Sequence, residues 1–144
     1  MILTSGIFSA LFFVKKEKGR IEELDVFLNL VNFILKNIEA FDMPICDILK
    51  KADGRILSLC NVSGYGEISI KEGVRLSNKE RQLLLSFFSE LGRGYREEQI
   101  KICKYYYGEL SELAGKLSGE YPQKRKLIFT LCICASLGVI ILFI

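Results

Sequence analysis

Histidine is absent from the 144 residues of the chain. Histidine is the commonest general base and a common zinc ligand, so its absence excludes most catalytic triads and most zinc hydrolases. Tryptophan is absent as well, and only two prolines occur. The formal net charge is only +3, which does not indicate a nucleic-acid-binding surface unless the basic residues gather in one patch. We therefore predict no catalytic residue, no metal site, no cofactor and no nucleic-acid partner.

The five cysteines form no C-x-x-C motif, and their odd number does not suggest a disulfide framework. They are typical of a reduced compartment. In a helix, Cys132 and Cys134 would point about 200° apart and could not share one ligand. We interpret all five as small apolar residues. An alternative is a membrane enzyme with Cys60 or Cys103 as nucleophile, but an ordinary thiol pKa of about 8.5 without a basic partner argues against it.

Hydrophobic residues are concentrated in blocks, because half of the residues are apolar although 26% are charged. Residues 127–144 carry no charge and would form a helix about 27 Å long, close to the roughly 30 Å hydrocarbon core of a bilayer. We predict a C-terminal transmembrane helix there, since a chain of this size can hardly bury a helix that is apolar on every side. Residues 1–14 are also uncharged but span only about 21 Å, so we predict a short N-terminal membrane segment there and leave open whether it crosses the bilayer.

Basic residues flank both apolar segments on the side that faces the middle of the chain. A secretory signal peptide would instead place its basic residues before the apolar stretch. The positive-inside rule therefore predicts that residues 15–126 lie in the cytoplasm and that the protein is located in the cell membrane. The predicted membrane flank consists of Lys15, Lys16, Lys18, Arg20, Lys124, Arg125 and Lys126.

Residues 15–126 have the apolar spacing of packed helices. Apolar side chains recur every three or four residues from Ile21 to Ile38, as in a helix that buries one face. Pro44 tolerates only a first-turn position, so a shorter helix is predicted from there to about Ala52. In residues 54–76, alternating isoleucines suggest a strand, whereas a possible capping box over residues 69–72 favours the short helix that we predict.

Two more helices follow. Ser77 and Glu80 form a better capping box, because an apolar helical repeat begins directly after it and Gly92 provides a stop signal. The next helix is predicted to begin near Gly94 and to loosen at Gly119 and Pro122. Gly108 and Gly115, seven residues apart, could allow a close helix crossing on this helix. The predicted fold class is thus all-α: an antiparallel helical bundle (15–126) anchored by membrane segments at 1–14 and 127–144.

Three further motifs carry weaker signals. Arg93, Arg96 and Lys101 beside the Leu91–Gly92 break are a candidate protein-binding surface, with a solvated turn as the alternative. The run 105–107 of three tyrosines, near Lys101 and Lys104, is more typical of packing than of base stacking, because no other basic and aromatic residues build a groove around it. The run 64–66 begins like a nucleotide-binding fingerprint, but Ser69 replaces its third glycine.

The layout of the whole chain resembles the stage III sporulation protein AB family. The resemblance is carried by a short apolar start, a basic stretch, a heptad helix and a terminal apolar span. The motifs are Asp42-Met43-Pro44, Glu90-Leu91-Gly92, Glu97-Glu98-Gln99-Ile100, Lys124-Arg125-Lys126 and Leu137-Gly138-Val139-Ile140-Ile141-Leu142.

This resemblance implies a membrane-anchored helical domain like the platform component of type II secretion systems. It further implies a non-catalytic coupling component of the channel between mother cell and forespore, with its bundle on the mother-cell side. The implied partners are a companion ATPase and other membrane subunits, and a homo-oligomer remains open. Gln99 joins Arg93, Arg96 and Lys101 in the candidate partner surface. The alternative function is a membrane-tethered adaptor outside sporulation.

Overall fold

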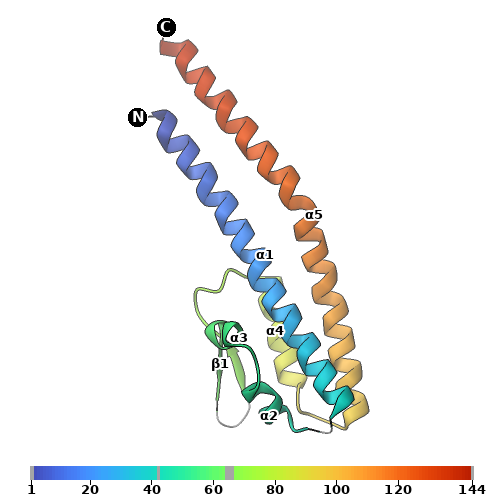
Figure 1. The fold of residues 1–144 in the computed structure, drawn as a ribbon. Helices are drawn as coiled ribbons and strands as arrows, with labels where there is room; N and C mark the ends of the chain where they lie inside the picture. Colours follow the sequence, from blue (N-terminus) through green and yellow to red (C-terminus); the bar gives the residue numbers. More distant parts are fainter. Residues whose placement is uncertain (1, 42, 64–66, 144) are drawn as a thin grey trace.

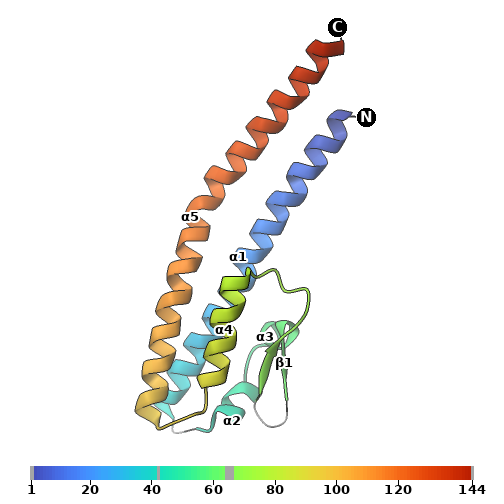
Figure 2. The same ribbon diagram turned by 180° about the vertical axis from the view of Figure 1, so that it is seen from behind.

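The computed structural model describes residues 2–41, 43–63 and 67–143, with only the backbone described at 2–7, 9, 136, 140, 142 and 143. Two long helices, α1 (Ile2–Ala40) and α5 (Arg96–Phe143), run antiparallel and side by side (Figures 1 and 2). The start of α1 and the end of α5 therefore lie at the same end of the molecule (Figure 1). The chain is mostly helical, as expected for the all-α class.

The shorter elements pack around the opposite half of this helix pair (Figures 1 and 2). They are α2 (Ile45–Lys50), α3 (Gly54–Leu59), β1 (Cys60–Val62), β2 (Ile68–Ile70) and α4 (Asn78–Glu90). Their apolar side chains meet α1 and α5 in one core, where Phe27, Ile48, Leu84, Phe87 and Leu110 are almost completely buried. The Phe87 and Tyr106 rings lie 5.4 Å apart between centroids and join α4 to α5 in this core.

The helix predicted over residues 21–38 is confirmed as part of α1, which continues beyond it in both directions. Leu24, Val31 and Ile38 on the predicted face are buried against the other helices. The helix continues toward its N-terminus through the buried Gly19, where a Cβ would collide with the guanidinium of Arg75. The short helix predicted from Pro44 is also found, as α2, with Pro44 at its N-cap.

Helix α5 is continuous where the sequence predicted a loosening, so the prediction at Gly119 and Pro122 was wrong. Proline removes one backbone hydrogen bond, the one to the carbonyl of Ser118. Residues 118–120 are exposed, so water can solvate that carbonyl. The axis of α5 bends near its middle (Figure 1), as helices commonly do at proline. The predicted close helix crossing is also wrong, because no other element of the described chain packs within 4 Å of where a Cβ would stand at Gly108 or Gly115.

Residues 54–76 differ most from the prediction. The side chain of Asp53 accepts a hydrogen bond from the Arg55 N–H, so the helix of this region starts at residue 54 rather than near 69. Residues 68–70 form strand β2, which pairs antiparallel with β1 in the register Cys60↔Ile70. The short helix predicted at residues 69–72 is therefore wrong, and the isoleucine alternation was the better signal. Asp42 and the 64–66 run lie outside the described residues.

A pair of neighbouring leucines tests the orientation of α4. Leu84 is completely buried and Leu85 is 43% exposed. We expect Leu84→Ala to lower the free energy of unfolding by about 2–5 kcal/mol, since it leaves a cavity in the core. Leu85→Ala should lower it by less than about 1 kcal/mol. Denaturant titration of the full chain in one detergent measures both, and equal losses would contradict this orientation.

Candidate functional site

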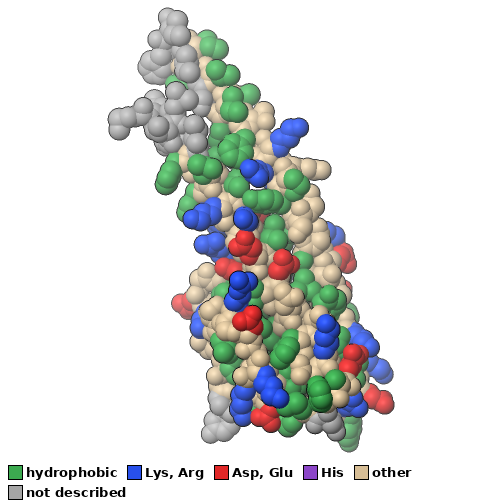
Figure 3. All heavy atoms as spheres, viewed as in Figure 1, with side chains coloured by type: hydrophobic (Ala, Val, Ile, Leu, Met, Phe, Trp, Pro, Cys, Tyr) green, Lys and Arg blue, Asp and Glu red, His purple; other side chains and the backbone are tan. Residues whose placement is uncertain are grey.

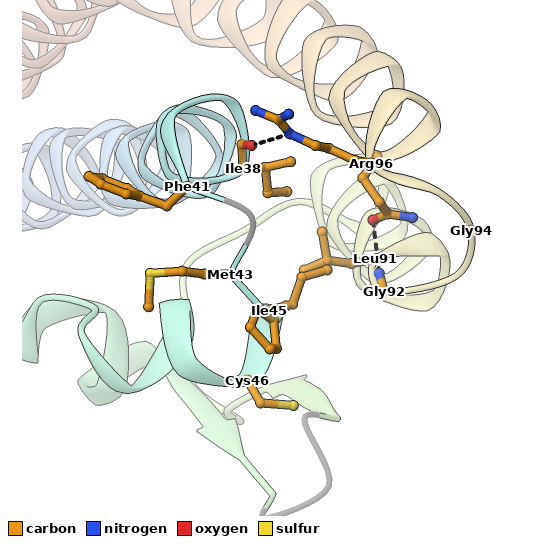
Figure 4. A pocket seen from close by; sticks show the side chains of 11 residues that line it. Ile38, Phe41, Met43, Ile45, Cys46, Leu91, Gly92, Gly94 and Arg96 are labelled. Carbon is orange, nitrogen blue, oxygen red and sulfur yellow. Dashed lines mark hydrogen bonds between the residues drawn. The ribbon is translucent and has the colours of Figure 1, made fainter.

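The end of the helix pair opposite the apolar segments, which we call the tip, comprises residues 38–41, 43–46 and 91–101. Here the link from α1 to α2 faces the turn from α4 to α5, and a hollow of about 460 Å³ opens between them (Figure 4). Its walls include the apolar side chains of Ile38, Phe41, Ile45 and Leu91, but the exposed lining is polar and apolar in nearly equal parts. The predicted partner residues Arg96 and Gln99 also line the hollow.

Arg96 holds the start of α5 against the end of α1. Its Nε donates to the carbonyl of Ile38 at 2.9 Å, and its Nη2 donates to the carbonyl of Glu39 at 2.6 Å (Figure 4 shows the first). Carbonyls in the last turn of a helix have no partner within the helix, and a cation there also interacts favourably with the helix dipole. Arg96 therefore caps α1, and its guanidinium is committed to contacts inside the molecule.

Gln99 organises the turn between α4 and α5. Its Oε1 accepts from the Gly92 N–H at 2.9 Å, and its Nε2 donates to the carbonyl of Arg93 at 2.5 Å. Gly92 and Gly94 have φ of +84° and +111°, a conformation that favours glycine. Gln99 is only 4% exposed, so it shapes the tip from within. Of the four predicted residues, Arg93 and Lys101 are exposed and form no ion pair with the residues that the structure describes.

The predicted helix cap is present at the start of α4 and has an additional partner. Ser77 Oγ accepts from the Glu80 N–H, and Glu80 Oε2 accepts from the Ser77 N–H at 2.8 Å. The Glu80 carboxylate also receives two hydrogen bonds from Arg20 on α1, at 3.1 Å from Nε and 2.6 Å from Nη2. Glu80 is only 1% exposed. One carboxylate thus caps α4 and fastens it to α1.

The charge of Glu80 is maintained by these partners. Burial raises the pKa of Glu80, but the hydrogen bonds from Arg20 and Ser77 outweigh it and leave the pKa below its ordinary value of 4.5. A carboxyl group whose pKa is lowered by folding stabilises the native state above its unfolded pKa. That contribution is lost as the pH falls through the lowered native value.

Glu80→Gln tests this contribution. At neutral pH we expect the free energy of unfolding to fall by about 1–3 kcal/mol, less than for a fully buried pair because Arg20 is partly exposed. The difference from wild type should shrink as the pH falls below 4.5. Denaturant titration at several pH values measures it. Glu112→Gln, at an exposed pair with Lys116, is the matched control and should show no measurable loss; an unchanged Glu80→Gln stability would contradict the role of Glu80.

The apolar segments lie at the other end of the helix pair and expose large side chains. Phe8 and Ile141 are each 75% exposed, and Phe12 and Leu137 are also exposed. Within residues 2–41, 43–63 and 67–143, no helix has the length and hydrophobicity needed to cross a membrane. The transmembrane helix predicted over 127–144 is therefore not supported here, and its last residue, Ile144, lies outside the described part of the chain.

The two parts of the predicted membrane flank are brought to the same level of the helix pair. Lys124 pairs with Glu120 at 2.8 Å, and this hydrogen bond raises the pKa of Lys124. Glu17 on α1 raises this pKa further and Arg20 opposes the rise, so both α1 residues lie within electrostatic reach of Lys124. Residues 15–20 and 124–126, far apart in sequence, therefore lie near one another on the helix pair.

The two candidate nucleophiles are buried thiols. Cys60 and Cys103 lie in the core, and burial raises the pKa of each to about 11. For Cys60 the charge of Lys71 opposes the rise but does not overcome it, and for Cys103 the charge of Glu39 adds to it. A thiolate is therefore scarce at neutral pH at both positions. In the described part of the chain, no cluster of three acidic or cysteine side chains could hold a metal ion.

Alkylation rates test the burial of these thiols. At neutral pH we expect iodoacetamide to modify Cys46, which is exposed, at least about 100-fold faster than Cys103, because a pKa near 11 leaves very little thiolate. Peptide mass spectrometry of the full chain measures both rates, and a denaturant should remove the difference. Rapid labelling of Cys103 in the folded protein would contradict its burial and revive the nucleophile alternative.

Comparison with known proteins identifies a family. The model of the stage III sporulation protein AB family (spore_III_AB) matches residues 67–144, just over half of the chain. The matched part contains β2, α4 and α5, and so includes the capping box, the tip turn and the basic residues 124–126. No curated protein and no solved structure matches the chain.

Proposed function

The chain belongs to the stage III sporulation protein AB family and so has a role in sporulation, and from this premise we propose that it is a non-catalytic membrane assembly component. In this proposal it couples a companion ATPase to other membrane subunits of the channel between mother cell and forespore. The family match is the observation that carries the role in sporulation. The arrangement of the two long helices supports how the protein performs it.

Membrane anchoring is supported by the exposed apolar ends. The antiparallel pairing of α1 and α5 leaves both ends on the same side of the molecule, where one bilayer could hold both (Figure 1). Phe8, Phe12, Leu137 and Ile141 would otherwise remain in water, and each large apolar side chain gains about 1.5–3 kcal/mol on burial. We propose that residues 1–14 and 127–144 are held in the cell membrane, with residues 15–126 on the cytoplasmic, mother-cell side.

The tip is the proposed contact with the ATPase. At 1.5 Å per residue, the stretch of α5 from Arg96 to Lys126 holds the tip about 45 Å from the proposed membrane surface. Arg96 and Gln99 make the tip rigid from within, which reduces the ordering cost of binding. The hollow, with its mixed polar and apolar lining, and the exposed cations Arg93 and Lys101 remain available to a partner.

A coupling role requires packed surfaces and no reactive side chain. The raised pKa values of Cys60 and Cys103 weigh against the cysteine-dependent enzyme. Membership of a sporulation family weighs against an adaptor that acts outside sporulation. The proposal needs no cofactor.

Charge reversal at the tip tests the proposal in sporulating cells. The tagged wild-type chain should remain with the membranes after an alkaline wash and should co-purify with an ATPase of the channel. Arg93→Glu combined with Lys101→Glu should reduce the recovered ATPase about tenfold, because a positive surface that guides the partner is lost. The variant should stay in the membrane fraction.

Arg55→Glu combined with Lys79→Glu is the matched control, since it makes the same charge change at exposed positions away from the tip. It should leave the ATPase yield unchanged. Release of the wild type by the alkaline wash would contradict membrane anchoring. Full ATPase recovery with the tip variant would contradict the assignment of the tip.

A further inference from the structure

Charge becomes exclusively positive toward the apolar ends of both long helices. No aspartate or glutamate occurs in residues 1–16 or 121–144, whereas lysine and arginine occur in both. On the face drawn in Figure 3, blue side chains lie directly below the apolar ends and red side chains begin further down. The molecule therefore presents a zone of uncompensated positive charge where its polar surface ends.

The cations in this zone differ in whether they have an acidic partner. Arg20 pairs with Glu80, Lys18 lies 3.6 Å from Glu22, and Lys124 pairs with Glu120. The remaining four are exposed and form no ion pair with any residue that the structure describes. These four are Lys15, Lys16, Arg125 and Lys126, the charged residues closest to the apolar ends.

The four unpaired cations lie at nearly one height, although they come from opposite ends of the sequence. Glu17 and Lys124 lie within electrostatic reach of one another. Lys15 and Lys16 are one or two residues beyond Glu17 on α1, and Arg125 and Lys126 are one or two beyond Lys124 on α5. At 1.5 Å per residue, Lys15 and Lys16 lie within about 3 Å of Glu17 along α1, and Arg125 and Lys126 lie within about 3 Å of Lys124 along α5. We call these four residues the basic collar.

We infer that the basic collar binds the headgroups of anionic phospholipids in the bilayer that holds the apolar ends. The inference rests on the proposed membrane anchoring and adds a lipid preference to it. Lysine and arginine near a membrane surface attract anionic lipids, and a phosphate can accept two parallel hydrogen bonds from one guanidinium. The Arg125 guanidinium lies 6.0 Å from the centre of the Phe129 ring, one turn closer to the apolar end. This contact holds its charge at the boundary where the headgroups would lie.

A lipid fits the collar better than an acidic protein. The collar directly borders Val14 and Leu127, and exposed apolar side chains follow it on both helices. An occupant must therefore offer negative charge at the level of the collar and an apolar phase immediately beyond it. An anionic phospholipid layer has both properties in this order.

Lipid composition around the reconstituted protein tests the inference. The full chain is placed in vesicles of equal amounts of phosphatidylcholine and phosphatidylglycerol and extracted with its adjacent lipids by a membrane-solubilising copolymer. The ratio of the two lipids in the extract is then measured. For the wild type we expect several-fold enrichment of phosphatidylglycerol. Replacing all four collar residues with glutamine should return the ratio nearly to that of the bulk vesicle, and high salt should lower the wild-type enrichment.

The control variant carries Lys36→Gln, Lys51→Gln, Arg55→Gln and Lys79→Gln, which remove the same charge from exposed positions away from the collar. It should retain the enrichment. A wild-type ratio equal to that of the bulk, or an equal loss in the control, would overturn the inference. So would a collar variant that keeps its enrichment, or that loses only a co-purified acidic protein.

Flotation with vesicles of pure phosphatidylcholine separates this inference from the proposed anchoring. A wild-type chain that floats but shows no phosphatidylglycerol enrichment would overturn the collar alone. A chain that does not float would overturn the anchoring, and the collar with it.

Discussion

The antiparallel packing of α1 against α5 is the constraint on which the rest of the structure depends. Its apolar seam begins in the core, at Leu24 and Leu110, and continues beyond the core to Ala10, which is buried although α1 has left the shorter helices behind. Because the two helices run in opposite directions, the beginning and the end of the sequence must meet. Two apolar segments and two basic stretches thereby lie together at one end of the molecule. From that end inward, the surface is first apolar, then carries unpaired cations, and then carries paired charges. A parallel pair would have separated them by the length of a helix.

The contact between Glu80 and Arg20 is a second constraint, because it fixes where the shorter elements end along the helix pair. Glu80 caps α4 and binds Arg20, so the first turn of α4 is fastened to α1 just below the basic collar. The preceding loop is held at the same place, since the Arg75 N–H donates to the Glu23 carboxylate and the Arg75 side chain covers Gly19. The commitment of Arg20 to Glu80 also explains why Arg20 differs from its neighbours in the flank: its charge is used within the protein, whereas those of Lys15 and Lys16 are not. Within this one basic stretch of the sequence, Arg20 therefore has a structural role, whereas Lys15 and Lys16 remain surface charges.

The sequence predicted the elements whose signals are local. The heptad of α1, the helix after Pro44 and the α4 boundaries follow from apolar spacing and capping residues that lie within a few positions of each other. Three features depended on contacts that the sequence does not show. From the sequence alone, Gln99 and Arg96 look like surface residues. In the structure, the turn at Gly92 contacts Gln99, and Arg96 binds the end of α1. Glu80 was identified as a cap, but its pairing with Arg20 joins residues 60 positions apart. The hairpin of β1 and β2 was missed because strands of three residues carry little pattern, and the capping-like residues 69–72 pointed to a helix.

Helix α5 continues through Pro122 and so connects the tip to the apolar end of the molecule. Leu117 still packs against the core, whereas the next few residues up to the collar are largely exposed, so Pro122 lies between the bundle and the collar. The helix lacks one backbone hydrogen bond there and has no core contacts to compensate for it, and its axis bends near its middle. Helix α1 has no proline on the opposite side, and its seam residue Val14 is half-buried. The pair is therefore asymmetric: α1 is the more uniform connection between the tip and the apolar end, and flexing between bundle and collar is expected to concentrate in α5 at Pro122.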